Sequence, residues 1–194
     1  MDGMNDCGVA ISQNAVPGRR MPFHPDRPTL ISNHIMRVVL DRADNVDEAI
    51  TLIRQFNVFF PVIACHMHIA DASGKSVLVE FTNGRMIVLQ NTVPWMVSTN
   101  FLICEERPDG ARSNCRRYST AYRHLQALHG SIPQNHVMRL LAATSQRTTI
   151  WSVVYNLDSG RVLLASGRDY GDLHEFQLPM ESAEALDHDG VSTE

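Results

Sequence analysis

The sequence predicts a mixed α+β fold in which antiparallel strands alternate with pairs of helices. Residues 61–100 contain consecutive short runs with strand-like alternation, separated by turn signals. Two amphipathic helical patterns precede this region, two follow it, and further strand-like runs come last. Because a meander buries at least one face of its sheet, the helices are expected to supply the cover, with two sheets lying between two helix layers.

The central region contains residues that favour turns between its strands. The first run alternates along residues 62–70, so that His66 and His68 share one face and the more apolar side chains the other. A turn follows in which Gly74 is free to take a positive φ, and residues 82–84, TNG, are a hairpin signal. We therefore expect four strands, at residues 62–70, 76–81, 85–90 and 95–98.

The part of the chain before this region is expected to hold one strand and two helices. Residues 8–14 have strand character, and four prolines within residues 15–28 predict a loop. Thr29 or Ser32 is expected to cap the first helix, and residues 45–48 form a capping-box pattern for the second. The side chains expected on the buried faces are Ile31, Ile35, Val38 and Val39 in the first helix and Val46, Ala49, Ile50 and Ile53 in the second.

Two more helices and a strand pair are expected after the central region. The third helix spans about residues 115–128 and is ended by Gly130, and the fourth opens near Pro133. Strands are expected at residues 148–156, 161–165 and 176–178. The face of the third helix expected in the core consists of Tyr118, Tyr122, Leu125 and Leu128, and that of the fourth of Val137, Leu140 and Leu141.

Composition is consistent with one cytoplasmic domain over residues 1–180, followed by an acidic, disordered tail at residues 181–194. The chain has 194 residues and 44% hydrophobic residues, which is enough for a sizeable core. A net charge of -4 without a basic stripe argues against nucleic acid as a partner, and no apolar stretch is long enough to span a membrane. Four cysteines without a CxxC pair indicate reduced thiols in the cytoplasm.

Four short segments, spread over most of the chain, form a recognisable pattern. They are residues 2–9, DGMNDCGV; residues 71–80, DASGKSVLVE; the pair Thr99-Asn100; and residues 113–116, SNCR. In this order they resemble the D-G-M-N-x-x-G-[LV], D-x-x-G-x-[SA]-x-[VI]-[VI]-E, T-N and S-x-S-R motifs of the choloylglycine hydrolase and linear amide C–N hydrolase superfamily. That superfamily includes acyl-transferases acting on 6-aminopenicillanic acid and acid amidases that cleave N-acylethanolamines.

The resemblance implies the αββα sandwich of N-terminal-nucleophile hydrolases and attack on an unactivated amide. In the family a processed N-terminal cysteine is the nucleophile and its own α-amino group is the base, helped by an arginine and an aspartate shortly downstream. The tetrahedral oxyanion is stabilised partly by asparagine side chains. The implied partner is a small-molecule acyl amide, and no cofactor or metal is expected.

The resemblance also assigns residues to the site. Asn100 matches the asparagine that holds the nucleophile's amine and the reacting carbonyl, and Arg116 matches the arginine that orients the nucleophile. Asn14 is a weaker match to a second asparagine, because the family position counted from Gly8 falls one residue later, at Ala15. We keep Asn14 as a further donor.

The chain departs from the family pattern at the catalytic residues. The nucleophile, the first hairpin and the helper arginine and aspartate have no match and would precede Met1, so we expect an N-terminally incomplete enzyme. Cys115 replaces the second serine of the S-x-S-R motif, and Arg117 replaces the usual aromatic residue. The alternative is a catalytically inactive, truncated paralogue that acts as a binding or structural remnant. Loss of a hairpin would leave sheet edges open, so a homo-oligomer is also considered.

Other cysteine, histidine and polar residues have both a structural and a functional interpretation. Cys7 either fills a variable position of the first motif or becomes a nucleophile after removal of the six residues before it. His66 and His68 are either polar residues on the less buried face of their strand or two ligands of a metal site. Without the resemblance, Asn100 would be a strand-end residue bound to backbone, and Arg116 a member of a surface ion pair.

Overall fold

The computed structural model describes residues 1–105 and 114–181. Its larger sheet has five strands, all paired antiparallel, in the order β1-β2-β5-β6-β7. Three of the four expected meander strands are therefore confirmed, and two strands from the N-terminal region extend the sheet at one edge. The five strands are β1 (Asp2–Met4), β2 (Ala10–Ala15), β5 (Cys65–Ala70), β6 (Ser76–Thr82) and β7 (Arg85–Gln90).

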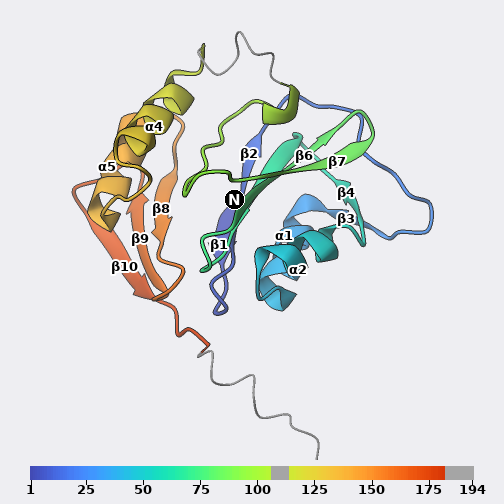
Figure 1. Ribbon diagram of the computed structural model, residues 1–194, viewed down its shortest axis with the longest axis horizontal. Coiled ribbons are helices and arrows are strands. Elements are labelled where there is room, and N and C mark those ends of the chain that lie inside the picture. Colours follow the sequence, from blue (N-terminus) through green and yellow to red (C-terminus); the bar gives the residue numbers. More distant parts are fainter. Residues whose placement is uncertain (106–113, 182–194) are drawn as a thin grey trace, which may run out of the picture.

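Two helices cover one face of this sheet. Helix α1 (Ser32–Arg42) contacts β2, and α2 (Val46–Ile53) contacts β5 (Figure 1). Between them lies the main apolar core, to which alternate residues of the strands contribute because successive side chains point to opposite faces. Its fully buried members include Ile11, Ile35, Val39, Ala49, Ile53, Met67, Ile69, Val77 and Val79.

Local signals in the sequence set two of the connections. Asn45 caps α2, since its side-chain oxygen accepts a hydrogen bond from the backbone N–H of Glu48 at 3.0 Å, as the capping-box pattern predicts. In the β6–β7 hairpin both Asn83 and Gly84 have positive φ, 51° and 72°. An Asn-Gly pair is typical of a type I′ turn, whose twist matches that of the flanking strands.

The C-terminal part forms a second, smaller sheet with its own helices. The strand order is β10-β9-β8, antiparallel, and α5 packs on β8 while α4 packs on α5. Met138, Val154, Leu163 and Ala165 form its buried centre. The elements are α4 (Arg116–Ala127), α5 (Gln134–Thr144), β8 (Trp151–Tyr155), β9 (Arg161–Ser166) and β10 (Leu173–Gln177).

The two sheets lie next to each other between the helix pairs. In Figure 1 the order from left to right is α4 and α5, the β8–β10 sheet, the five-stranded sheet, and then α1 and α2. Asp2 on β1 connects the sheets, because it accepts hydrogen bonds from Trp151 Nε1 at 2.9 Å and from the Tyr155 hydroxyl at 2.6 Å. Within the described residues, no helix has the length and apolar character that crossing a membrane requires.

Several expectations for the elements are wrong. Residues 95–98 are irregular, because Pro94 lacks a donor for pairing and Trp95 turns away to pack edge-on against Tyr122 of α4, with ring centroids 4.8 Å apart. The strand expected from residue 62 begins only at Cys65. Ile31 is not helical; it belongs to β3 (Thr29–Ile31), which pairs in parallel with β4 (Asn57–Phe59).

Helix ends and faces differ from expectation in two further places. No side chain caps α1, so the caps expected at Thr29 or Ser32 are wrong. On α4, Tyr118 is buried, but Leu128 is exposed because the helix contacts the rest of the molecule along only part of its length. Most of the proposed tail, residues 182–194, lies outside the described residues.

A buried carboxylate fixes the chain that follows the five-stranded sheet. Glu80 on β6 is fully buried, and it accepts hydrogen bonds from the backbone N–H groups of Ile103 and Cys104, both at 2.8 Å. His66 Nδ1 lies 3.1 Å from the same carboxylate. Burial raises the pKa of Glu80, but these donors outweigh it and leave the pKa below its ordinary value. Glu80 thus attaches the 3-10 turn η1 (Ile103–Glu105) to the sheet.

Replacing this carboxylate should destabilise the protein. Glu80→Gln keeps the shape but turns an N–H₂ group toward a backbone donor, so we expect the free energy of unfolding in urea at pH 7 to fall by about 2–4 kcal/mol. Because the folded pKa is depressed, this stabilisation is present above the unfolded pKa of about 4.3 and is lost as the pH falls through the folded pKa. The difference in the free energy of unfolding between wild type and variant should therefore become smaller below about pH 4.

Glu175→Gln is the matched control for this measurement. Glu175 forms an exposed ion pair with Arg161 on the β9–β10 sheet, and such pairs contribute little to stability. A Glu80→Gln protein as stable as the Glu175→Gln protein would show that the buried carboxylate does not hold η1.

Candidate active site

Three segments that are distant in sequence meet at the end of β2. Asn100, from the segment after the irregular residues 95–98, donates from Nδ2 to the carbonyl oxygen of Ala15 at 2.7 Å. Arg117, in the first turn of α4, donates to Asn100 Oδ1 at 2.7 Å. The end of β2, the Thr99-Asn100 pair and the start of α4 therefore lie together.

Arg117 decides which way the Asn100 amide faces. A guanidinium can only donate, so the atom it contacts must be the amide oxygen, and the N–H₂ group then points to the opposite side. One of the two N–H₂ hydrogens is bonded to Ala15, and the amide has a second hydrogen to donate. Asn100 can thus present an oriented donor to a group that acquires negative charge next to the end of β2.

A half-buried polar chain runs across the neighbouring strands. Asn14 donates from Nδ2 to the Ser98 hydroxyl at 3.0 Å, and Ser98 Oγ lies 3.3 Å from His68 Nδ1. His68 Nε2 lies 2.8 Å from the hydroxyl of Ser76. Burial, with a smaller contribution from the nearby His66, lowers the pKa of His68 to about 4. His68 is therefore neutral at physiological pH, and it joins the hydroxyls without adding charge.

The thiol of Cys115 also belongs to this cluster. Cys115 is the N-cap residue of α4, and its sulfur lies 3.4 Å from the Thr99 hydroxyl. Burial raises its pKa, but the hydrogen bonds from Thr99 and from the backbone N–H groups of Tyr118 and Arg117, together with the Arg117 charge, outweigh burial and lower the pKa. A helix N-terminus next to a cation is a setting in which thiolates are stabilised.

A small apolar cavity lies beside the polar chain. It has a volume of about 260 Å³ and is adjacent to Ser76, whose hydroxyl contacts Met96 Sδ at 3.8 Å. Leu78, which is paired in register with His68, forms part of its wall. The remaining apolar walls are Leu89, Val93, Trp95, Val97, Ile103 and Tyr118.

The structure places the expected site residues differently. Asn100 lies in the cluster, and Asn14 reaches it through Ser98. Arg116 does not: its side chain is exposed, and the contact with Asn100 is made by the next residue, Arg117. Consecutive helical residues point about 100° apart, so only one of two adjacent arginines can face the strand end. The motif pointed to Arg116, and it identified Arg117 only as the replacement of the usual aromatic residue.

Cys7 lies far from this cluster and in the wrong electrostatic setting for a nucleophile. It precedes β2, whereas Asn14 and Ala15 end that strand. Its sulfur is 3.3 Å from a carboxylate oxygen of Asp44 and 3.5 Å from one of Glu181. Burial and these two carboxylates raise the pKa of Cys7 to about 12, so the thiol stays protonated.

His66 is more buried than we expected, whereas His68 is half-buried. His66 is fully buried against Glu80, and His68 is held between Ser76 and Ser98. The reason is that the second face of the sheet is also covered, so its polar residues must bind one another. Among the described residues, no group of three or more His, Cys, Asp or Glu side chains is arranged to hold a metal ion.

Sheet order, paired helices and the cluster at the end of β2 are consistent with the fold that the sequence resemblance implies. Comparisons with known proteins identify the family. The sequence profile of the acyl-coenzyme A:6-aminopenicillanic acid acyl-transferase family matches residues 1–169. The chain therefore belongs to this family. A search of curated proteins found no match.

Solved structures share the fold at low sequence identity. A mutant of conjugated bile acid hydrolase from Clostridium perfringens superposes with a TM-score of 0.68 at 16% identity, over 93% of this chain and 73% of that one. Penicillin V acylase from Agrobacterium tumefaciens gives 0.66 at 19% identity, over 86% of this chain and 62% of that one. A second variant of the Clostridium hydrolase gives 0.66 at 14% identity, over 91% and 72% of the two chains.

The four thiols should differ in their rate of alkylation at pH 7. All are partly exposed to a similar degree, so the thiolate fraction should decide the order. Iodoacetamide should label Cys115 first, because its pKa is lowered, and Cys7 and Cys104 last, because their pKa values are raised to about 12. Peptide mass spectrometry over a time course measures all four rates in one sample.

Arg117→Gln should slow the labelling of Cys115, while Arg116→Gln should leave it unchanged. Labelling of Cys7 ahead of Cys115 would contradict the electrostatic description of both sites.

Proposed function

We propose that this chain is the larger part of an enzyme that cleaves linear amide C–N bonds, or transfers the acyl group, within an αββα sandwich. The nucleophile is the sulfur of an N-terminal cysteine that is not among these 194 residues. The convergence of Asn100, Arg117 and the end of β2 carries the proposal. Family membership and the shared fold support it.

The described cysteines do not suit this role. Cys7 lies among carboxylates that keep it protonated, and Cys65 has a pKa raised by burial. Cys104 donates its thiol toward Glu80, which together with burial raises its pKa to about 12. Cys115 has the most acidic setting, but it is inside the chain and has no α-amino group to serve as the base.

The proposed reaction gives roles to Asn100 and Arg117. The thiolate attacks the amide carbonyl carbon, a C–S bond forms, and the carbonyl oxygen becomes an oxyanion. The second N–H of Asn100 donates to this oxygen, and Arg117 keeps the amide in that orientation and adds positive charge nearby. The C–N bond then breaks, the amine leaves with the proton taken from the thiol, and water or a second amine releases the acyl group from the thioester.

The apolar cavity beside the polar chain suits the acyl group. Its walls come from β6, β7 and the irregular segment that leads into Asn100. A group bound in the cavity therefore contacts the segment that carries the proposed oxyanion donor. Burial of an apolar acyl chain against Leu78, Trp95 and Tyr118 would provide binding energy remote from the reacting bond. We therefore propose an acyl amide of a compact apolar acid as the substrate.

Adjacent arginines allow a matched test of this site. In protein produced together with the segment encoded before Met1, Asn100→Ala should lower kcat about 100- to 1,000-fold on acyl amides, because one oxyanion donor is lost. Arg117→Gln should lower kcat at least about 10-fold, because the amide loses its fixed orientation. Arg116→Gln should retain wild-type kcat and KM. Release of amine, followed by mass spectrometry, measures each.

If Arg116→Gln lowered kcat and Arg117→Gln did not, the geometry would be contradicted and the orienting role would belong to Arg116. Turnover by the 194-residue chain alone, abolished by Cys115→Ser, would overturn the proposed external nucleophile. Tight binding of acyl amides with no turnover in either form would instead support a non-catalytic binding protein.

A further inference from the structure

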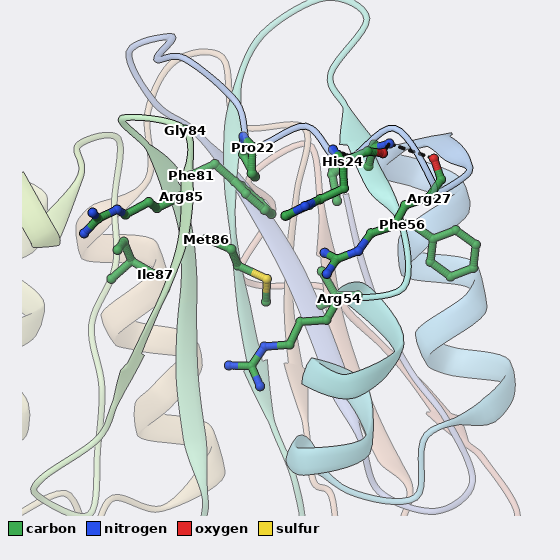
Figure 2. Close-up of a pocket in the computed structure, with 13 residues that line it drawn as sticks. Pro22, His24, Arg27, Arg54, Phe56, Phe81, Gly84, Arg85, Met86 and Ile87 are labelled. Carbon is green, nitrogen blue, oxygen red and sulfur yellow. Dashed lines mark hydrogen bonds between the residues drawn. The ribbon is translucent and has the colours of Figure 1, made fainter.

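A second cavity lies on the helix-covered side of the five-stranded sheet. It is bounded by the loop at residues 22–27, the end of α2 with the start of β4, and the β6–β7 hairpin (Figure 2). Its volume is about 390 Å³, within the lower part of the range of small-molecule sites. Because it opens on the face that carries α1 and α2, it is separated by the sheet from the candidate active site.

The floor of this cavity is apolar and continuous with the main core. Ile53, Val58 and Phe81 are buried members of that core, and Met86 packs against it. A molecule that enters the cavity therefore meets fixed hydrocarbon and aromatic surface, not mobile exposed side chains. Such a floor favours an apolar body by the transfer of its surface out of water.

The rim on the opposite side is basic. Figure 2 shows the side chains of His24 and Arg27 pointing from this rim toward the sheet, while the Arg54 side chain runs from the end of α2 to a position below Met86. The described lining contains no Asp or Glu, and within the described residues neither guanidinium pairs with a carboxylate. In a protein with a net charge of -4, unpaired guanidinium groups beside an apolar floor are a specific local arrangement.

A buried amide holds the backbone of His24 and Arg27 in position. Asn57 is only 4% exposed, and it accepts a hydrogen bond from the backbone N–H of His24 at 2.8 Å. It also donates to the carbonyl oxygens of His24 at 2.9 Å and Arg27 at 2.7 Å. The loop between prolines 22 and 28 is thereby fixed before any ligand arrives, which reduces the entropy lost on binding.

Arg85 lines the same cavity but points elsewhere. It pairs in register with Thr82, on the face of the sheet away from α1 and α2, whereas Met86 and Phe81 face the helices. Figure 2 agrees, because the Arg85 guanidinium is directed away from the other basic side chains. Arg85 is thus a nearby cation that does not contribute to the basic rim.

We propose that this cavity binds a small amphiphile with one anionic head group and a short apolar body. The head group lies between Arg27 and Arg54, where a carboxylate or a phosphate can accept charge-assisted hydrogen bonds from both guanidinium groups. The apolar body lies on Met86 and Phe81. This site is distinct from the proposed acyl cavity and does not depend on the chemistry proposed there.

Calorimetric titration of the 194-residue chain tests the proposal with four probes. Octanoate and octyl phosphate carry both features, octanol only the apolar body, and acetate only the head group. We expect octanoate or octyl phosphate to bind at least about tenfold more tightly than octanol and acetate. Whichever of the two binds more tightly identifies the head group, and either order supports the site.

Variants distinguish this site from other binding. Arg27→Gln/Arg54→Gln should weaken binding of the preferred amphiphile at least about tenfold, and Arg85→Gln should leave it unchanged. In ¹H–¹⁵N spectra the shifts caused by the ligand should centre on Phe81 and Met86 and spare Asn100. Absence of binding by both amphiphiles, equal loss in Arg85→Gln, or shifts centred on Asn100 would each overturn the proposal.

Discussion

The position of the candidate site depends on the buried carboxylate of Glu80. Asn100 lies in a stretch without regular hydrogen bonding, and η1 just after it is attached to β6 by two backbone N–H groups that donate to Glu80. A carboxylate in a fully buried position is stable only when its acceptor sites are filled, and here His66 and the chain itself fill them. The sheet therefore orders the segment that contains η1, and the backbone N–H groups of that segment stabilise the buried charge of Glu80.

The two faces of the five-stranded sheet serve different purposes. Alternate residues facing α1 and α2 are aliphatic and supply the core. Their neighbours on the other face include Asn14, His68 and Ser76, which bind one another and lead to Ser98. Polar side chains on a partly covered face bind mainly within the protein, so this face has few permitted arrangements. That restriction suits a surface that positions reacting groups.

Features encoded by neighbouring residues could be predicted from the sequence, and features set by distant packing could not. The capping box at Asn45 and the Asn-Gly turn depend on side chains acting on their own backbone, and both are present. The irregular path at Trp95 depends on Tyr122, and the choice of Arg117 over Arg116 depends on where α4 begins relative to β2. The full burial of His66 follows from a covering layer that alternation along one strand cannot reveal.

The hydrogen bonds that Trp151 and Tyr155 make to Asp2 have a consequence for assembly of the fold. They join partners 149 and 153 positions apart, so they can form only after residues 151–155 have left the ribosome. Until then the Asp2 carboxylate lacks both partners. Docking of the second sheet onto β1 is therefore a late step in the folding of this chain, and the five-stranded sheet can assemble before it.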